Sequence, residues 1–157
     1  MPLVFDLLKT GLEKQWLVPE GGGFPQSVAE SGDRFAGAVS SWFAAAQAGT
    51  LPCATAIPRK SQLATTAAAA LGAMSAQAAG AQLALAVATY IAGQAFGAGV
   101  AGFPIATSAA ISQMIAVFSD TGGSVGQKAE QIATACTLLA TTTIVAGPIP
   151  LFPSPIV

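Results

Sequence analysis

The sequence predicts an all-α fold, a loose bundle of four to five Ala-rich helices that ends in an extended, Pro-rich C-terminal arm. Three observations lead to this prediction. No charged residue interrupts the 59 Ala-rich positions between Lys60 and Asp120. Two Ser-x-x-Glu/Gln motifs, which begin at Ser27 and Ser124, are typical of helix N-termini. Four prolines lie in the segment 148–157, where they exclude a helix or a central strand.

The composition indicates one domain, 1–157, with an unusual surface. Charged residues make up 8% of the 157 and hydrophobic residues 53%, whereas about 25% of a typical soluble domain is charged. A long exposed segment normally carries charges for solubility. We therefore expect much of this chain to be covered by other protein or by lipid. A formal net charge of −1 and the lack of basic runs argue against nucleic-acid binding.

Residues 1–26 are predicted to be an N-terminal helix followed by a Gly-rich hinge. Apolar side chains recur on one stripe through 3–17, as in an amphipathic helix. Pro19 and the glycines at 21–23 end this helix. The apolar residues at the N-terminus are interspersed with charges, which is not the pattern of a signal peptide, so we expect synthesis in the cytoplasm without export.

Four further helical segments follow. The Ser27 motif starts a helix that runs to about residue 46, with Gly49 as its C-terminal stop. The segment 61–94 contains no proline and reads as one long helix, or as two with a break near Gly80. Helices are also expected over 105–118 and from Ser124 to about residue 139. Residues 141–145 then have some β tendency.

The residue types that carry most enzyme chemistry are missing or scattered. The chain has no His and seven dispersed carboxylates, so we predict no catalytic residues, no metal site and no cofactor. Cys53 could have a lowered pKa beside Arg59 and Lys60, but a buried structural role is the simpler interpretation for it and for Cys136. The spacing leaves open whether these two cysteines form a disulfide.

Large apolar side chains are predicted instead to make contacts with neighbouring chains, because aromatic residues commonly anchor interfaces. The apolar end of the chain, 146–157, is expected to be an extended arm that docks in a groove on a partner. The predicted interface residues are Trp16, Trp42, Phe43, Tyr90, Phe96, Phe103, Ile149, Leu151, Phe152 and Ile156.

Two interpretations of the apolar composition stay open. Segments within 76–100 and 131–153 are long enough to span a bilayer, which would give a small, holin-like multi-span protein of the host inner membrane. Gln82, Gln94 and the prolines make these poor spans. The alternative is a subunit that is buried in a large multi-chain particle.

The second interpretation is supported by a resemblance over about residues 35–157. The segments FAGAVSSWFAAAQAG and GVAGFPIATSAAI, the Ala/Gly/Gln-rich stretch between them and the Pro-rich end resemble small virion structural proteins of contractile-tailed bacteriophages, especially those of marine and cyanobacterial hosts. The resemblance implies a tail or baseplate subunit of the virion. Its partners would be copies of itself and other virion structural proteins.

Overall fold

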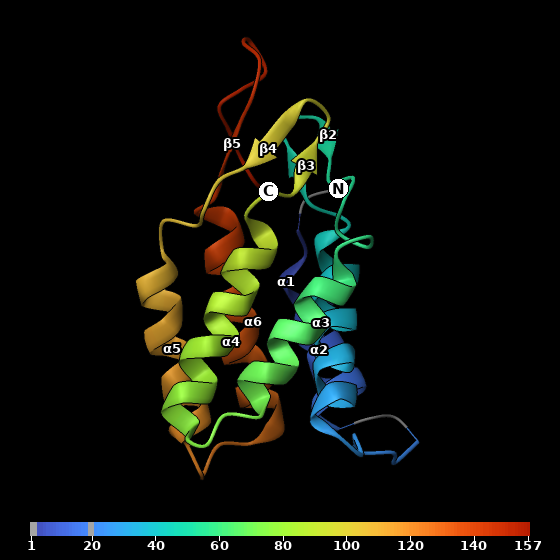
Figure 1. The fold of residues 1–157 in the computed structure, drawn as a ribbon, viewed down its shortest axis with the longest axis vertical. Coiled ribbons are helices and arrows are strands. Elements are labelled where there is room, and N and C mark those ends of the chain that lie inside the picture. Colours follow the sequence, from blue (N-terminus) through green and yellow to red (C-terminus); the bar gives the residue numbers. More distant parts are fainter. Residues whose placement is uncertain (1–2, 19–20) are drawn as a thin grey trace.

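The computed structural model describes residues 3–18 and 21–157, which form a helical bundle with small sheets at one end (Figure 1). The prediction of a mostly helical fold is confirmed. The described residues contain six α-helices and one π-helical turn, more than the four or five helices expected. The helices are α1 (Phe5–Gly11), η1 (Leu12–Leu17), α2 (Val28–Phe43), α3 (Lys60–Leu71), α4 (Ala76–Ile91), α5 (Thr107–Ser119) and α6 (Val125–Thr141).

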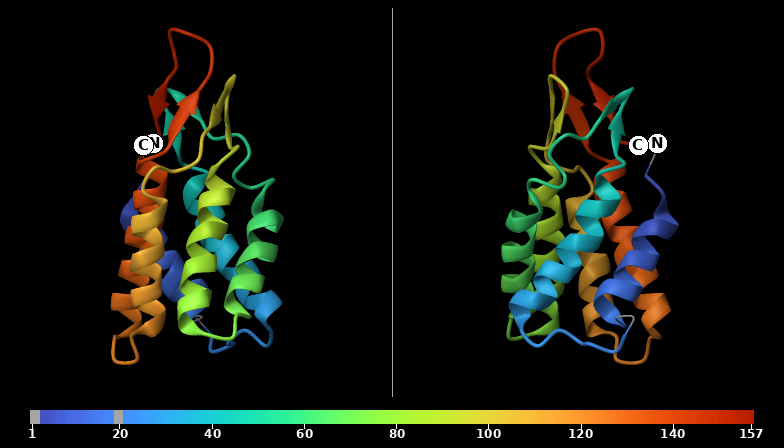
Figure 2. Two further views of the ribbon diagram at one scale, coloured as in Figure 1. Left: turned by 60° about the vertical axis from the view of Figure 1, so that its left-hand side comes forward. Right: turned by 90° about the vertical axis from the view of Figure 1, so that its right-hand side faces the viewer.

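Six short strands lie beyond one end of the bundle (Figures 1 and 2), and their pairing closes a ring. Antiparallel pairing joins β1 to β2, and joins β3 to β4, β5 and β6 in that order. Two bridges, Cys53–Phe96 and Ala48–Ile156, connect the two sheets at both edges. The strands are β1 (Gln47–Ala48), β2 (Leu51–Pro52), β3 (Ala95–Phe96), β4 (Gly99–Ala101), β5 (Ile144–Ala146) and β6 (Ser154–Pro155). We call the segments 44–58, 92–106 and 142–157, which carry this ring, the crown.

The architecture repeats three times around the long axis. Each long helix, α2, α4 or α6, leads into a hairpin of the crown, and α2 and α4 are then followed by the shorter helices α3 and α5. The third unit has no helix after its hairpin, but α1 begins near the end of β6 (Figure 2) and with η1 fills that place. This repeat was not predicted from the sequence.

Equivalent residues start and fill the three units. Each long helix begins with a Ser whose hydroxyl accepts a hydrogen bond from the N–H three residues on, namely Ser27, Ser75 and Ser124. The two Ser caps that were predicted are confirmed, and that of Ser124 is a full capping box. The short helices bury matching triplets, which are Leu63, Ala67 and Ala70 in α3, Ala110, Met114 and Val117 in α5, and Leu8, Leu12 and Trp16 in α1 and η1.

The segment 61–94 is not one long helix. It forms α3 and α4, which pack against each other and are connected by residues 72–75. At the start of α4 the Ser75 hydroxyl accepts a hydrogen bond from the Ala78 N–H, which has no partner within the new helix. Gly80, where a break was considered, lies inside α4.

Gly49 does not end α2 but forms the turn between β1 and β2, with φ of +62°.

Most of the predicted C-terminal arm belongs to the crown. β6 pairs with β5, and Gln47 and Val157 exchange two backbone hydrogen bonds of 2.9 Å. The side chains of Phe152 and Ile156 are buried, whereas the segment 147–153 between β5 and β6 projects furthest from the bundle (Figure 1). The chain's own hairpins therefore hold both ends of the arm. Pro19, assigned to end the first helix, lies outside the described residues.

One chain covers more of its apolar surface than the composition suggested. The accessible surface of 7184 Å² is close to the roughly 7,200 Å² that scaling for compact monomers predicts at 15.5 kDa. Small side chains allow this, because Ala and Gly permit close approach of neighbouring helices. No helix among the described residues has both the length and the apolar character to cross a membrane.

Gly80→Ala is expected to destabilise the fold because a Cβ atom there would lie 2.7 Å from backbone atoms of Met114 and Ile115 in α5. Overpacking of this kind typically costs about 1–3 kcal/mol. Gly126→Ala is the control, since a Cβ in α6 meets nothing within 4 Å and Ala is the better helix former. Thermal unfolding followed by circular dichroism should show a lower Tm for Gly80→Ala alone. Equal Tm values would contradict the close α4–α5 packing.

Candidate interaction surface

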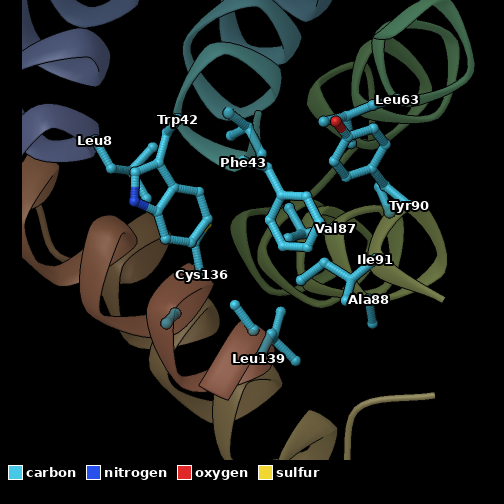
Figure 3. Close-up of a cluster of buried hydrophobic side chains, with 14 of the residues drawn as sticks. Leu8, Trp42, Phe43, Leu63, Val87, Ala88, Tyr90, Ile91, Cys136 and Leu139 are labelled. Carbon is cyan, nitrogen blue, oxygen red and sulfur yellow. The ribbon is translucent and has the colours of Figure 1, made fainter. Parts of the chain in front are cut away.

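Most of the predicted interface residues lie in the chain's own core. Trp42 points from α2 toward α6, Phe43 lies beside Val87 of α4, and Tyr90 extends toward Leu63 of α3 (Figure 3). Phe43 is the centre of this cluster, with its ring centroid 5.9 Å from that of Tyr90 and 6.4 Å from that of Phe96. The predicted residues that are buried are Trp16, Trp42, Phe43, Tyr90, Phe96, Phe152 and Ile156.

The other three predicted residues are exposed, and all of them lie in the crown. Phe103 is 54% exposed, Leu151 59% and Ile149 87%. The last two are on the projecting segment 147–153. These three side chains can contact a neighbour without any change in the fold.

The crown contains further exposed apolar side chains that were not predicted from the sequence. They are Ile57, Val100, Ile105, Ile144 and Val157. The three crown segments contain none of the chain's charged residues, although they hold half of the large exposed apolar side chains of the described residues. One sequence feature could have predicted this surface: each of the three crown segments follows a helix and contains no charged residue.

Charged residues of the described part lie on α1, η1, α2 and α6 and at the ends of α3 and α5, and several form ion pairs. Lys9 is 3.0 Å from Glu130 and Lys60 is 2.9 Å from Asp33. The hydrogen bond and the charge of Glu130 raise the pKa of Lys9. Glu30 accepts hydrogen bonds from the Gln26 N–H and from Arg34, and these lower the pKa of its carboxyl group. The crown is thus free of charge, as are α4 and α5, and the charges of the described residues lie on the other helices and at helix ends.

A buried polar network fastens the crown to the helices. The Gln94 side chain accepts a 2.6 Å hydrogen bond from the Thr55 hydroxyl and donates to the Tyr90 carbonyl. The Tyr90 hydroxyl donates to the Ala56 carbonyl over 2.7 Å. Arg59 donates to the Ala92 carbonyl at the end of α4. These bonds join the first two hairpins to α4, which makes the crown continuous with the bundle.

Burial raises the pKa of both thiols. Cys53 lies beside this network, and burial outweighs the opposing effects of nearby backbone N–H groups and Arg59 on its pKa. Lys60, which could also have activated the thiol, pairs with Asp33. Cys136 is fully buried in α6 with a pKa of about 12. The two cysteines are free thiols, and neither has the low pKa of a reactive nucleophile.

The grooves on the helical surface are modest. A groove of about 420 Å³ lies between α5 and α6 and is lined by Gln113, Ala116, Val117, Asp120, Gln131 and Thr134. A groove of about 230 Å³ between α1 and α2 is lined in part by Trp42, whose buried indole N–H has no acceptor. Within 3–18 and 21–157, no group of three or more His, Cys, Asp or Glu side chains could hold a metal ion.

Comparison of the chain with protein-family models, with curated proteins and with solved structures found no match. A function can therefore be inferred only from the geometry of the crown and from the resemblance of the sequence to phage virion proteins. The crown is the surface with the most unusual chemistry in the described part of the molecule.

Alkylation should distinguish the two cysteines. In the native protein at pH 8, iodoacetamide is expected to modify partly exposed Cys53 slowly and to leave Cys136 unmodified, because burial keeps both thiols protonated and hides the second. Unfolding in urea should make the two equally reactive. Mass spectrometry of the digested protein measures both rates. Rapid modification of Cys136 without urea would contradict the packing of α6.

Proposed function

We propose that this protein is a structural subunit of a large multi-chain particle and acts by burying its crown against neighbouring subunits. The observation that carries the proposal is the charge-free crown, which exposes eight large apolar side chains, half of those that are exposed in the described residues. Exposed apolar surface that lacks charge commonly marks a contact with another protein. The proposal assigns the chain no catalytic role.

The crown is suited to a permanent contact. Burial of a large aliphatic side chain contributes about 1.5–3 kcal/mol, so hiding Ile105, Ile149 and Leu151 contributes on the order of 5 kcal/mol. That is comparable with the total stability of many domains. Three of the four prolines in 148–157 lie on the exposed segment 147–153 and have no backbone N–H to desolvate, which lowers the cost of covering it.

The particle we propose is a bacteriophage virion, with the protein in its tail or baseplate. This narrower assignment is supported by the sequence resemblance over about residues 35–157. In it, the Ala-rich helices form the rigid body and the Pro-rich segment 147–153 is the arm that reaches a neighbour. The partners are other copies of the chain and other virion structural proteins.

Fractionation of the producing cells tests this function. The protein is expected to sediment with large particles, to resist carbonate washing and mild detergent, and to be released by urea, because apolar protein contacts hold it. Ile149→Lys combined with Leu151→Lys should lower its share in the particles several-fold. Met74→Lys, which also places a lysine at a fully exposed apolar position, on the α3–α4 connection, is the control and should incorporate normally.

Two outcomes would contradict the proposal. Recovery of the wild-type protein as a free species in the supernatant would exclude a permanent structural role. Extraction from membranes by mild detergent as a homogeneous helical species would instead favour the alternative, a holin-like membrane protein.

A further inference from the structure

The groove between α1 and α2 contains a buried hydrogen-bond donor without an acceptor. Its volume is about 230 Å³, and its polar lining residues are Gln15, Ser41 and Trp42, whereas the other described lining residues are aliphatic or glycine. The side chain of Trp42 is 4% exposed, and its indole N–H has no partner among the described residues. Figure 3 shows the indole nitrogen on the edge of the ring toward Leu8 of α1, the helix that forms the opposite wall of the groove.

The other aromatic donors of this chain all have acceptors. The chain contains two Trp and one Tyr. The Trp16 indole N–H donates to the Ser31 hydroxyl over 2.7 Å, and the Tyr90 hydroxyl donates to the Ala56 carbonyl over 2.7 Å. Buried Trp and Tyr side chains usually have such partners, because a buried donor without an acceptor costs free energy. Trp42 is the exception among the three, and an acceptor from outside the chain would remove this cost.

The lining of the groove determines the charge and the size of what fits. No charged side chain is among the described residues that line it, so a carboxylate or phosphate group bound there would lose water and gain no counter-charge. A neutral carbonyl oxygen can accept the N–H hydrogen bond at a lower desolvation cost. The groove is also smaller than the sites of drug-sized ligands, which have volumes of about 300–1,000 Å³. A small neutral molecule is therefore the best match.

We propose that the α1–α2 groove binds a small neutral molecule with an aliphatic body and a carbonyl oxygen, and that the Trp42 N–H donates to this oxygen. The aliphatic body packs on Val4, Leu7 and Ala45, which line the groove. Val4 and Leu7 are 39% and 59% exposed, so the ligand also covers apolar surface that is otherwise in water. This inference does not depend on the proposed assembly role, which concerns the exposed side chains of the crown.

Nuclear magnetic resonance of the ¹⁵N-labelled full chain tests the site with cyclohexanone as the probe. The spectrum contains one indole N–H signal for each Trp. Cyclohexanone is expected to move the Trp42 signal downfield in a saturable manner, because the N–H gains an acceptor. The Trp16 signal is the internal control and should stay in place, since Ser31 already accepts its hydrogen bond. Methylenecyclohexane, in which a CH₂ group replaces the carbonyl oxygen, should cause no downfield shift of either signal.

Two matched variants test whether the groove is the place of binding. Ala45 is partly exposed and lines the groove, so Ala45→Leu should raise the dissociation constant of cyclohexanone by roughly tenfold, because the larger side chain takes up volume that the ligand needs. Ala44→Leu makes the same change at the exposed neighbouring residue, which is not among the described lining residues, and should bind like wild type. Far-UV circular dichroism establishes that each variant is folded, and the wild-type titration tests the proposal if Ala45→Leu does not fold.

Each of the other outcomes overturns the proposal. A Trp42 signal that does not move with cyclohexanone, or that moves equally with methylenecyclohexane, excludes the hydrogen bond. A folded Ala45→Leu variant that binds cyclohexanone as tightly as Ala44→Leu excludes the groove. A Trp42 signal that moves downfield as the protein concentration rises, without any probe, assigns the acceptor to a second copy of the chain in place of a small molecule.

Discussion

Closure of the crown is the constraint on which the rest of this structure depends. Strands of two or three residues are too short to be stable as separate hairpins, and their backbone polar groups must find partners. In the ring, each hairpin is hydrogen-bonded to the next, and we call the three junctions seams. At these seams the backbone N–H of Gln47 donates to Val157, that of Ala54 to Ala95, and that of Gly102 to Ile144. Each seam joins two of the three repeated units, so closure also fixes the order of the helices below.

The helices can pack closely beneath the crown because small residues lie where they contact each other. A Cβ atom at Gly32 would come within 2.5 Å of the Ala64 carbonyl oxygen, and one at Gly80 would meet α5 at 2.7 Å. The third unit has buried Ala129 at the matching place, five residues after its Ser cap. Close packing lets one chain hide a large apolar content. Half of the large apolar side chains that remain exposed in the described residues lie in the charge-free crown, and this is the basis of the proposed assembly role.

The sequence predicted the helices and the Ser27 and Ser124 caps because these depend on local signals. Apart from the β tendency at 141–145, which overlaps β5, it did not predict the strands, since pairs such as Ala95–Phe96 are too short to show a period of two. The repeat was missed because few identities mark it, although Ser27, Ser75 and Ser124 are 48 and 49 residues apart. The aromatic residues assigned to the interface proved to be mostly core. The side chains that cover these aromatic residues belong to other repeated units, and a local sequence pattern cannot predict such contacts.

Native-state amide hydrogen exchange tests the closed crown most directly. If the ring is closed, the N–H groups of Gln47, Ala54 and Gly102 open only with the whole domain, and all three should be protected to the same degree as the centres of α2, α4 and α6. Exchange at these three seams that is orders of magnitude faster than in the helices would show that the hairpins are separate, and it would contradict closure of the ring.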